Sequence, residues 1–135
     1  MNDFRFVRIY VDVDVNPTED ANKVAVAVKR VLGDLSLQII DEKNKRRLIG
    51  NAEGLECLLK FQELLKRERI RDAARALLTS CISEEEINFC LNKQVAYMGH
   101  ISFSQSEGES PLGPIRIKIV CDQPRQLIEW LTAKT

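Results

Sequence analysis

Apolar and polar side chains alternate strictly along the first segment of the chain, residues 4–15. The apolar positions on one side are Val7, Ile9, Val11, Val13 and Val15, and those between them are Phe6, Arg8, Tyr10, Asp12 and Asp14. A period of two residues is typical of a β-strand with one face in the core and the other partly in water. The pattern therefore predicts a long strand over residues 4–15.

A change of period marks a helix directly after this strand. Its start signals are Asn16, Pro17 and Glu19, since asparagine can cap a helix, proline suits the first turn and Glu19 completes a capping box. Apolar residues then recur at helical spacing at Ala21, Val24, Ala25, Val28, Val31 and Leu32. Gly33 is expected to end the helix, because glycine readily adopts the conformation needed just after a helix terminus.

The remaining apolar patterns predict a hairpin, further strands and a closing helix. The expected segments are strands over 35–39, 47–51, 87–91, 94–104 (interrupted near Gly99) and 115–119, and a helix that begins at Pro124. A charged turn at 41–46 joins the first two of these strands into a hairpin.

Residues 55–82 contain neither glycine nor proline and are expected to be helical, with a change of phase in the middle. In the second half, one apolar stripe at helical spacing comprises Ile70, Ala73, Ala74, Leu77, Leu78 and Cys81. Extended backward, that stripe misses Phe61 and Leu64, so the apolar face rotates near residues 66–69. We expect two helices joined by a tight corner there.

The predicted order is strand, helix, two strands, two helices, three strands and a helix. Hairpin connections favour antiparallel pairing, and the helices must cover the apolar side of the sheet. We therefore predict an α+β fold in a single domain, residues 1–135, with a largely antiparallel sheet and helices packed on one face.

Composition is that of an ordinary globular protein, with 44% hydrophobic and 30% charged residues. No apolar run approaches the roughly 20 residues of a membrane-spanning helix, and the N-terminus shows no basic-then-apolar leader. We expect a cytoplasmic protein with no membrane partner. The cysteines lack the close spacing of a zinc or redox motif and are expected to be reduced and buried, a disulfide being the alternative. They are Cys57, Cys81, Cys90 and Cys121.

Charge is balanced overall but unevenly distributed. Residues 43–75 hold 10 Lys and Arg against 5 Asp and Glu, whereas residues 1–42 hold 5 against 8 and residues 76–110 hold 1 against 5. A basic segment between acidic ones can attract a polyanion such as RNA without making the whole protein basic.

The densest positive charge falls on the expected corner between two helices. Guanidinium groups present planar forks of donors that suit phosphate. The predicted RNA contacts at this basic corner are Lys66, Arg67, Arg69, Arg71 and Arg75. A second set, the hairpin patch, is predicted at Lys43, Lys45, Arg46 and Arg47. The alternative for the basic corner and for the hairpin patch is an ordinary solvent-exposed surface. On the helices, such a surface would contain ion pairs within the helix, each worth about 0.2–0.5 kcal/mol.

Aromatic side chains on the polar side of the first strand have two possible roles. Phe6 and Tyr10 could stack RNA bases or form the seam of a homodimer. We favour the homodimer, because the neighbouring Asp12 and Asp14 would repel phosphate.

Enzymatic chemistry has little support in the sequence. There is one histidine, His100, and no nucleophile elbow, zinc-protease motif or phosphate-binding glycine loop. Asp12 and Asp14 would lie about 6.8 Å apart on one strand face and could hold Mg²⁺, but no third carboxylate or base accompanies them. We predict no catalytic residue, no metal and no cofactor.

Several segments together resemble a known archaeal family. They are the helix start at 17–20, residues 58–75 (LLKFQELLKRERIRDAAR), Asn92-Lys93-Gln94, Glu109-Ser110-Pro111-Leu112-Gly113 and Glu129-Trp130-Leu131. The family comprises small uncharacterised proteins labelled predicted RNA-binding or exosome-associated. The resemblance spans nearly the whole chain. It implies a fold similar to the ribosomal protein that binds 5S rRNA, homodimers and an archaeal cytoplasm, and it supplies no catalytic residues.

The functional hypothesis is a non-enzymatic protein that binds RNA through backbone phosphates at the basic corner. A first alternative is a dimeric adaptor in an RNA-processing assembly, whose basic surface meets an acidic protein. A second is a metal-dependent phosphoryl-transfer enzyme that uses Asp12 and Asp14.

Overall fold

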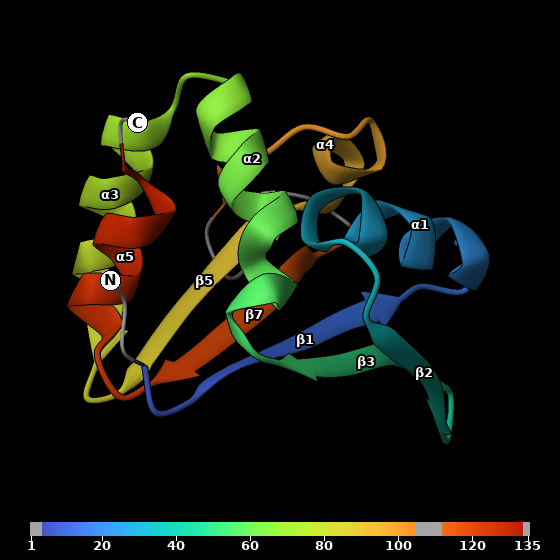
Figure 1. The fold of residues 1–135 in the computed structure, drawn as a ribbon. Helices are drawn as coiled ribbons and strands as arrows, with labels where there is room; N and C mark the ends of the chain where they lie inside the picture. Colours follow the sequence, from blue (N-terminus) through green and yellow to red (C-terminus); the bar gives the residue numbers. More distant parts are fainter. Residues whose placement is uncertain (1–3, 105–111, 134–135) are drawn as a thin grey trace.

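The computed structural model describes residues 4–104 and 112–133 and contains one antiparallel sheet (Figure 1). The strand order is β2-β3-β1-β7-β5-β4, and β6 also pairs with β5. The strands are β1 (Val7–Val15), β2 (Ser36–Glu42), β3 (Lys45–Glu53), β4 (Ile82–Ser83), β5 (Glu86–Asn92), β6 (Phe103–Ser104) and β7 (Pro114–Cys121). Every pairing is antiparallel, as the hairpin signals predicted.

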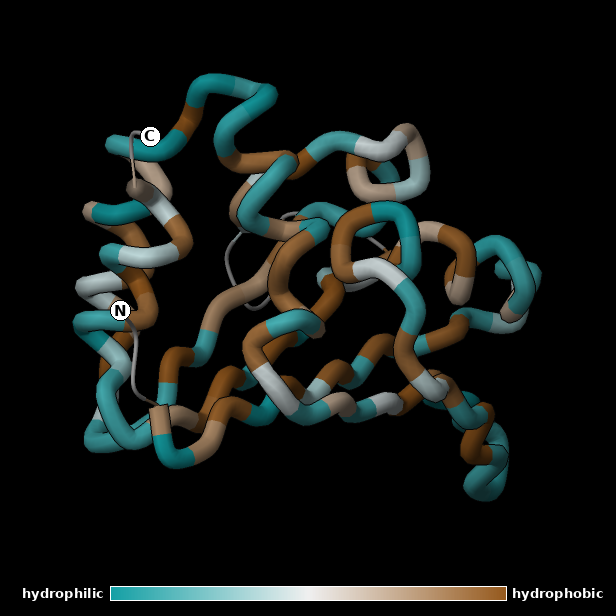
Figure 2. Tube along the Cα trace, viewed as in Figure 1, coloured by the Kyte–Doolittle hydropathy of each residue, from teal (hydrophilic) through white to brown (hydrophobic). Residues whose placement is uncertain are grey.

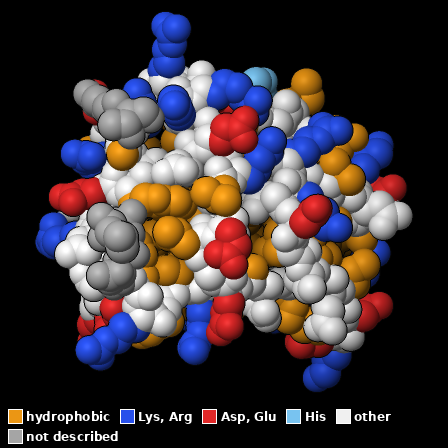
Figure 3. All heavy atoms as spheres, in the orientation of Figure 1, with side chains coloured by type: hydrophobic (Ala, Val, Ile, Leu, Met, Phe, Trp, Pro, Cys, Tyr) orange, Lys and Arg blue, Asp and Glu red, His pale blue; other side chains and the backbone are white. Residues whose placement is uncertain are grey.

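The helices gather on one side of this sheet (Figure 1), which confirms the predicted α+β architecture and element order. They are α1 (Ala21–Leu32), α2 (Leu59–Arg67), α3 (Arg71–Ser80), α4 (Lys93–Tyr97) and α5 (Pro124–Leu131), with a short 3₁₀ turn, η1 (Leu55–Leu58), before α2. The surface seen from the same side mixes charged and apolar groups (Figure 3). None of the helices in the described ranges is long and apolar enough to cross a membrane.

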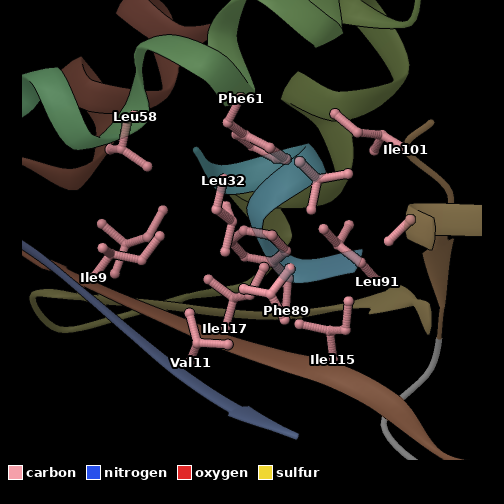
Figure 4. Packing of buried hydrophobic residues seen from close by; sticks show 14 of the residues in the cluster. Ile9, Val11, Leu32, Leu58, Phe61, Phe89, Leu91, Ile101, Ile115 and Ile117 are labelled. Atoms are coloured by element: carbon pink, nitrogen blue, oxygen red, sulfur yellow. The ribbon is translucent and has the colours of Figure 1, made fainter. Parts of the chain in front are cut away.

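The core lies between the sheet and the helices. The alternation along β1 is confirmed, because its odd-numbered residues are all at most 5% exposed, and apolar and polar positions alternate visibly along the strands (Figure 2). Phe61 of α2 points toward Phe89 and Ile117 of the sheet (Figure 4). The rings of Phe61 and Phe89 stack with centroids 5.7 Å apart, and Phe103 meets both edge-on. These aromatic contacts fasten α2 to the strands.

The predicted corner between two helices is confirmed. Helix α2 ends at Arg67, α3 begins at Arg71, and Arg69 between them has a φ of 57°. The amide of Ile70 donates to the carbonyl of Leu65 and closes the turn. Gly33 ends α1 with a φ of 79°, also as predicted.

Two local predictions are wrong. Residues 94–104 do not form a strand: α4 occupies 93–97, and only Phe103–Ser104 pairs with the sheet. The Asn92 side chain accepts from the amide of Val95 and so caps a helix where apolar spacing indicated a strand. Helix α1 begins at Ala21 with Asp20 as its cap, because Asn16 and Glu19 bond to each other in the preceding turn.

The four cysteines form no disulfide; Cys90 and Cys121 are buried as expected, whereas Cys57 and Cys81 are only partly buried. Burial raises the pKa of Cys57 and of Cys121 to about 11. Both thiols therefore stay protonated near neutral pH, as expected of cysteines that act as small apolar residues.

Candidate nucleic-acid interface

The basic corner projects from the helical side of the molecule. Lys66 and Arg67 form the last turn of α2, Arg69 lies in the left-handed turn, and all three side chains are exposed. Lys and Arg side chains stand out along the top edge of the surface, where Figure 1 places the α2–α3 junction (Figure 3). The turn therefore places these three cationic side chains in contact with solvent.

Glu68, the acid between Arg67 and Arg69, points inward. Its side chain is only 18% exposed. One carboxylate oxygen accepts from the amide of Ile101 at 3.2 Å, and the other lies 2.9 Å from Nδ1 of His100. Arg67 and Arg69 make no ion pair with any of the described residues. The corner consequently keeps its positive field.

Arg71 and Arg75 have a structural contact that sequence analysis did not reveal. Arg71 donates to the carbonyl of Ala133 at 2.8 Å, and Arg75 donates to the hydroxyl of Thr132 at 3.0 Å. Thr132 in turn donates to the carbonyl of Ile128 at 2.7 Å. Both arginines therefore tie α3 to the end of α5. A guanidinium has five N–H donors, so each retains donors for a second partner.

The hairpin patch is separate from the basic corner. Figure 1 shows the tip of β2 and β3 at the opposite end of the molecule from the α2–α3 junction. Lys43 and Lys45 are exposed at this tip, whereas Arg46 donates to the carbonyl of Glu19 at 3.3 Å. Arg47 binds Asp12 through two hydrogen bonds of 3.0 and 3.1 Å, which together with the Asp12 charge raise the pKa of the guanidinium. The two basic sets therefore do not form one continuous surface.

The sheet face opposite the helices, called the open face below, carries rows of ion pairs. Arg8 pairs with Glu53, Arg47 with Asp12 and Arg116 with Asp14, each at 3.0 Å. A hollow of about 850 Å³ extends from this face to the end of α3, and Tyr10, Lys118 and Ser80 are among the residues that line it. Tyr10 is 40% exposed, and the ammonium of Lys118 lies 5.8 Å from its ring centre.

Lys93 is a buried cation to which sequence analysis assigned no role. Its ammonium donates to the carbonyls of Asp14 and Leu112, both at 2.8 Å, and to Oε1 of Glu19 at 3.0 Å. The side chains of Lys93 and Glu19 are 5% and 11% exposed. This buried pair joins β1, the turn before α1, α4 and the start of β7.

The segments that carry the family resemblance contain the residues of this pair but do not show that they meet. Three of the segments that carry the family resemblance, at 17–20, 92–94 and 109–113, each contribute one residue to the cluster. Most of the third segment lies outside the described residues, and Leu112 is its contributor. The clustering gives these motifs a shared structural role around one buried ammonium.

Comparisons with known proteins agree with this fold. A family model described as RNA binding matches residues 8–121. A UPF0201 protein of Sulfurisphaera tokodaii is 42% identical over 95% of this chain and 88% of its own length. A second, from Sulfolobus acidocaldarius, is 40% identical over the same shares.

Solved structures are similar over nearly the full length. The crystal structure of a UPF0201 protein from Methanococcus jannaschii has a TM-score of 0.82 at 30% identity, covering 93% of this chain and 98% of that one. A DUF54 protein from Methanothermobacter thermautotrophicus, at 17% identity and a TM-score of 0.60 over 96% of both chains, shares the fold.

Proposed function

This chain belongs to the archaeal UPF0201 family of predicted RNA-binding proteins, and we propose that it binds RNA through backbone phosphates at the basic corner. The observation that carries the proposal is the orientation of Glu68. Its carboxylate is bonded to residues 100 and 101, while Arg67 and Arg69 on either side point into solvent. Arg67 and Arg69 make no ion pair among the described residues, so both are available to a phosphate oxygen.

The five residues of the basic corner contribute unequally under this proposal. Lys66, Arg67 and Arg69 supply the most accessible charge, and Arg71 and Arg75 add donors not used at the end of α5. The hairpin patch is proposed as a weaker, separate contact, since Arg46 and Arg47 already have intramolecular partners. Contacts of this kind position a protein on RNA without reading the base sequence.

Filter binding against a mixed RNA pool at several salt concentrations tests the proposal. Each neutralised phosphate on a single strand contributes about −0.7 to the slope of log affinity against log salt, so five contacts give a slope near −3.5. Absence of binding at low salt would contradict the proposal. The adaptor would then be the better account, and its partners would survive ribonuclease treatment of a pull-down.

The phosphoryl-transfer alternative finds no support in the arrangement of Asp12 and Asp14. Arg47 holds the first carboxylate in a bidentate contact, and Arg116 holds the second. A Mg²⁺ ion would have to compete with both guanidinium groups for these carboxylates. The proposed function accordingly includes no catalytic step.

We further propose that the open face forms a homodimer, with Phe6 and Tyr10 at the interface. The charges on this face are largely paired within the chain, which lowers the desolvation cost of burying them in an interface. Tyr10 is an exposed aromatic side chain that could pack against a partner. Light scattering is expected to give about twice the 15.4 kDa of one chain. Tyr10→Glu should shift the population toward monomer, whereas Tyr97→Glu, an exposed tyrosine on another surface, should not. A parent protein that scatters as a single chain at micromolar concentration contradicts the dimer.

A further inference from the structure

Helix α4 presents a fixed aromatic side chain to solvent. Tyr97 and Met98, at its C-terminal end, are 37% and 68% exposed. The helix itself is firmly held, because Lys93 is anchored by three segments of the chain and Ala96 is buried in the core. The exposed end is therefore a rigid feature of the surface.

Arg30 of α1 backs this aromatic side chain. Its guanidinium carbon lies 5.0 Å from the centre of the Tyr97 ring, and its Nη1 donates to the Tyr97 backbone carbonyl. A guanidinium stacked on an aromatic ring holds the ring in place and brings positive charge to it. The pair forms a flat, positively charged platform.

A hollow of about 600 Å³ lies between α1 and α4 beside this platform. Lys23, Gln94, Tyr97 and Met98 are among the residues that line it. Its volume falls in the range typical of small-ligand sites. The hollow is large enough for a nucleoside.

Two cations at the hollow are available to an anion. Glu19, which lines the hollow, is paired with Lys93, whereas Asp20 caps α1 by accepting from the amide of Asn22 and keeps its negative charge. Lys23 in the lining and Arg30 behind Tyr97 make no ion pair among the residues that the structure describes. A phosphate group beside the hollow can therefore contact Lys23 or Arg30.

The exposed end of α4 is linked to the basic corner. Glu68 at the corner is bonded to residues 100 and 101, which follow the end of α4 after Gly99. Figure 1 shows α4 beside the upper part of α2. A nucleic-acid strand with phosphates on Arg67 and Arg69 can therefore continue onto α4 and α1.

From this arrangement we infer that the hollow between α1 and α4 accepts an unpaired base of single-stranded RNA, stacked on Tyr97. The inference rests on the proposed RNA binding and specifies its substrate class. Phosphate contacts alone need only charge, whereas a rigid exposed aromatic beside cations is the combination that single-strand binders use. A paired base in a duplex is already stacked and does not reach such a platform. Gln94 offers an amide donor and acceptor at the rim for the base edge.

The test measures binding of a fluorescein-labelled oligouridine that carries one 2-aminopurine, with an RNA duplex of equal length as the comparison probe. Tyr97→Leu removes the aromatic face, Tyr97→Phe keeps it, and Leu59→Ala, at an exposed apolar side chain at the start of α2, is the control. A base–aromatic stack predicts that Tyr97→Leu weakens single-strand binding roughly 5- to 150-fold. Tyr97→Phe and Leu59→Ala should bind as the parent does, and duplex binding should not change with any of them.

Quenching of 2-aminopurine on binding gives a second readout, which reports stacking directly. Quenching is expected with the parent and with Tyr97→Phe, and its loss is expected with Tyr97→Leu. Tyr97→Leu that binds and quenches like the parent, while neutralised corner residues weaken binding, overturns the inference and leaves the proposed function intact. Absence of RNA binding by the parent overturns both.

Discussion

Replacing Lys93 with methionine is expected to lower the free energy of unfolding by about 3–5 kcal/mol, the usual cost of breaking a buried ion pair. Methionine nearly fills the volume of the lysine stem, so the loss comes from the ammonium. Without it, the Glu19 carboxylate stays buried with no cation, and two backbone carbonyls lose their donor.

Urea unfolding followed by circular dichroism measures this loss. Lys29→Met is the matched control, because Lys29 is exposed on α1 and its replacement should change stability by no more than about 0.5 kcal/mol. Adding Glu19→Gln to Lys93→Met should restore part of the loss, since the unpaired charge is removed. A stability of Lys93→Met equal to that of the control would show that the pair is not needed for folding.

The same pair predicts a loss of stability in acid. Burial alone would raise the pKa of Glu19, but hydrogen bonds from Asn16 and Lys93, together with the Lys93 charge, outweigh it, and the pKa is lowered. A carboxyl group whose pKa is lower in the folded state than in the unfolded state stabilises the fold. This stabilisation is complete at pH values above the pKa of the unfolded state, about 4.3 for glutamate. This contribution is lost as the pH falls through the folded pKa. The urea concentration at the unfolding midpoint of the parent should therefore decrease as the pH is lowered below about 4.3. The Glu19→Gln variant should show a smaller decrease over the same pH range.

Neutralising Arg67 and Arg69 together should weaken RNA binding in a salt-dependent way. Arg67→Gln keeps a helix-forming side chain, and Arg69→Asn suits the left-handed backbone at this position. Removing two of five phosphate contacts flattens the log–log salt slope from about −3.5 to about −2.1. Over a fourfold rise in salt, the parent should lose about 130-fold in affinity and the variant only about 20-fold.

The control for this variant removes the same charge elsewhere. Arg5 and Arg125 are exposed. Arg125 lies in the first turn of α5, at the opposite end of that helix from Thr132, which Arg75 of the basic corner contacts. Arg5→Gln with Arg125→Gln should retain the parent slope. If the corner variant and the control variant give the same slope of log affinity against log salt, the net charge of the protein governs binding and the basic corner does not. The loss in the corner variant should be similar on unrelated RNA sequences, because phosphate contacts do not distinguish bases.

Much of the fold could be predicted because it depends on local periodicity. The alternation over β1, the Gly33 terminus of α1 and the phase change near residues 66–69 each reflect which side chains must face one common core. Such patterns repeat within a few residues, so they are visible without knowledge of the rest of the chain. The concentration of cations at the α2–α3 corner was equally a local property.

What the tertiary structure decided depends on partners distant in sequence. Lys93 is buried because its ammonium pairs with Glu19, 74 residues earlier in the chain. Lys93 is also the first residue of α4, a helix in a segment where apolar spacing indicated a strand. Arg71 bonds to a residue 62 positions later, and the hairpin patch lies far from the basic corner. Tyr97 and Arg30 form a platform only because α1 and α4 pack together. Pairings of this kind arise from the geometry of chain folding, which no local pattern of residues encodes.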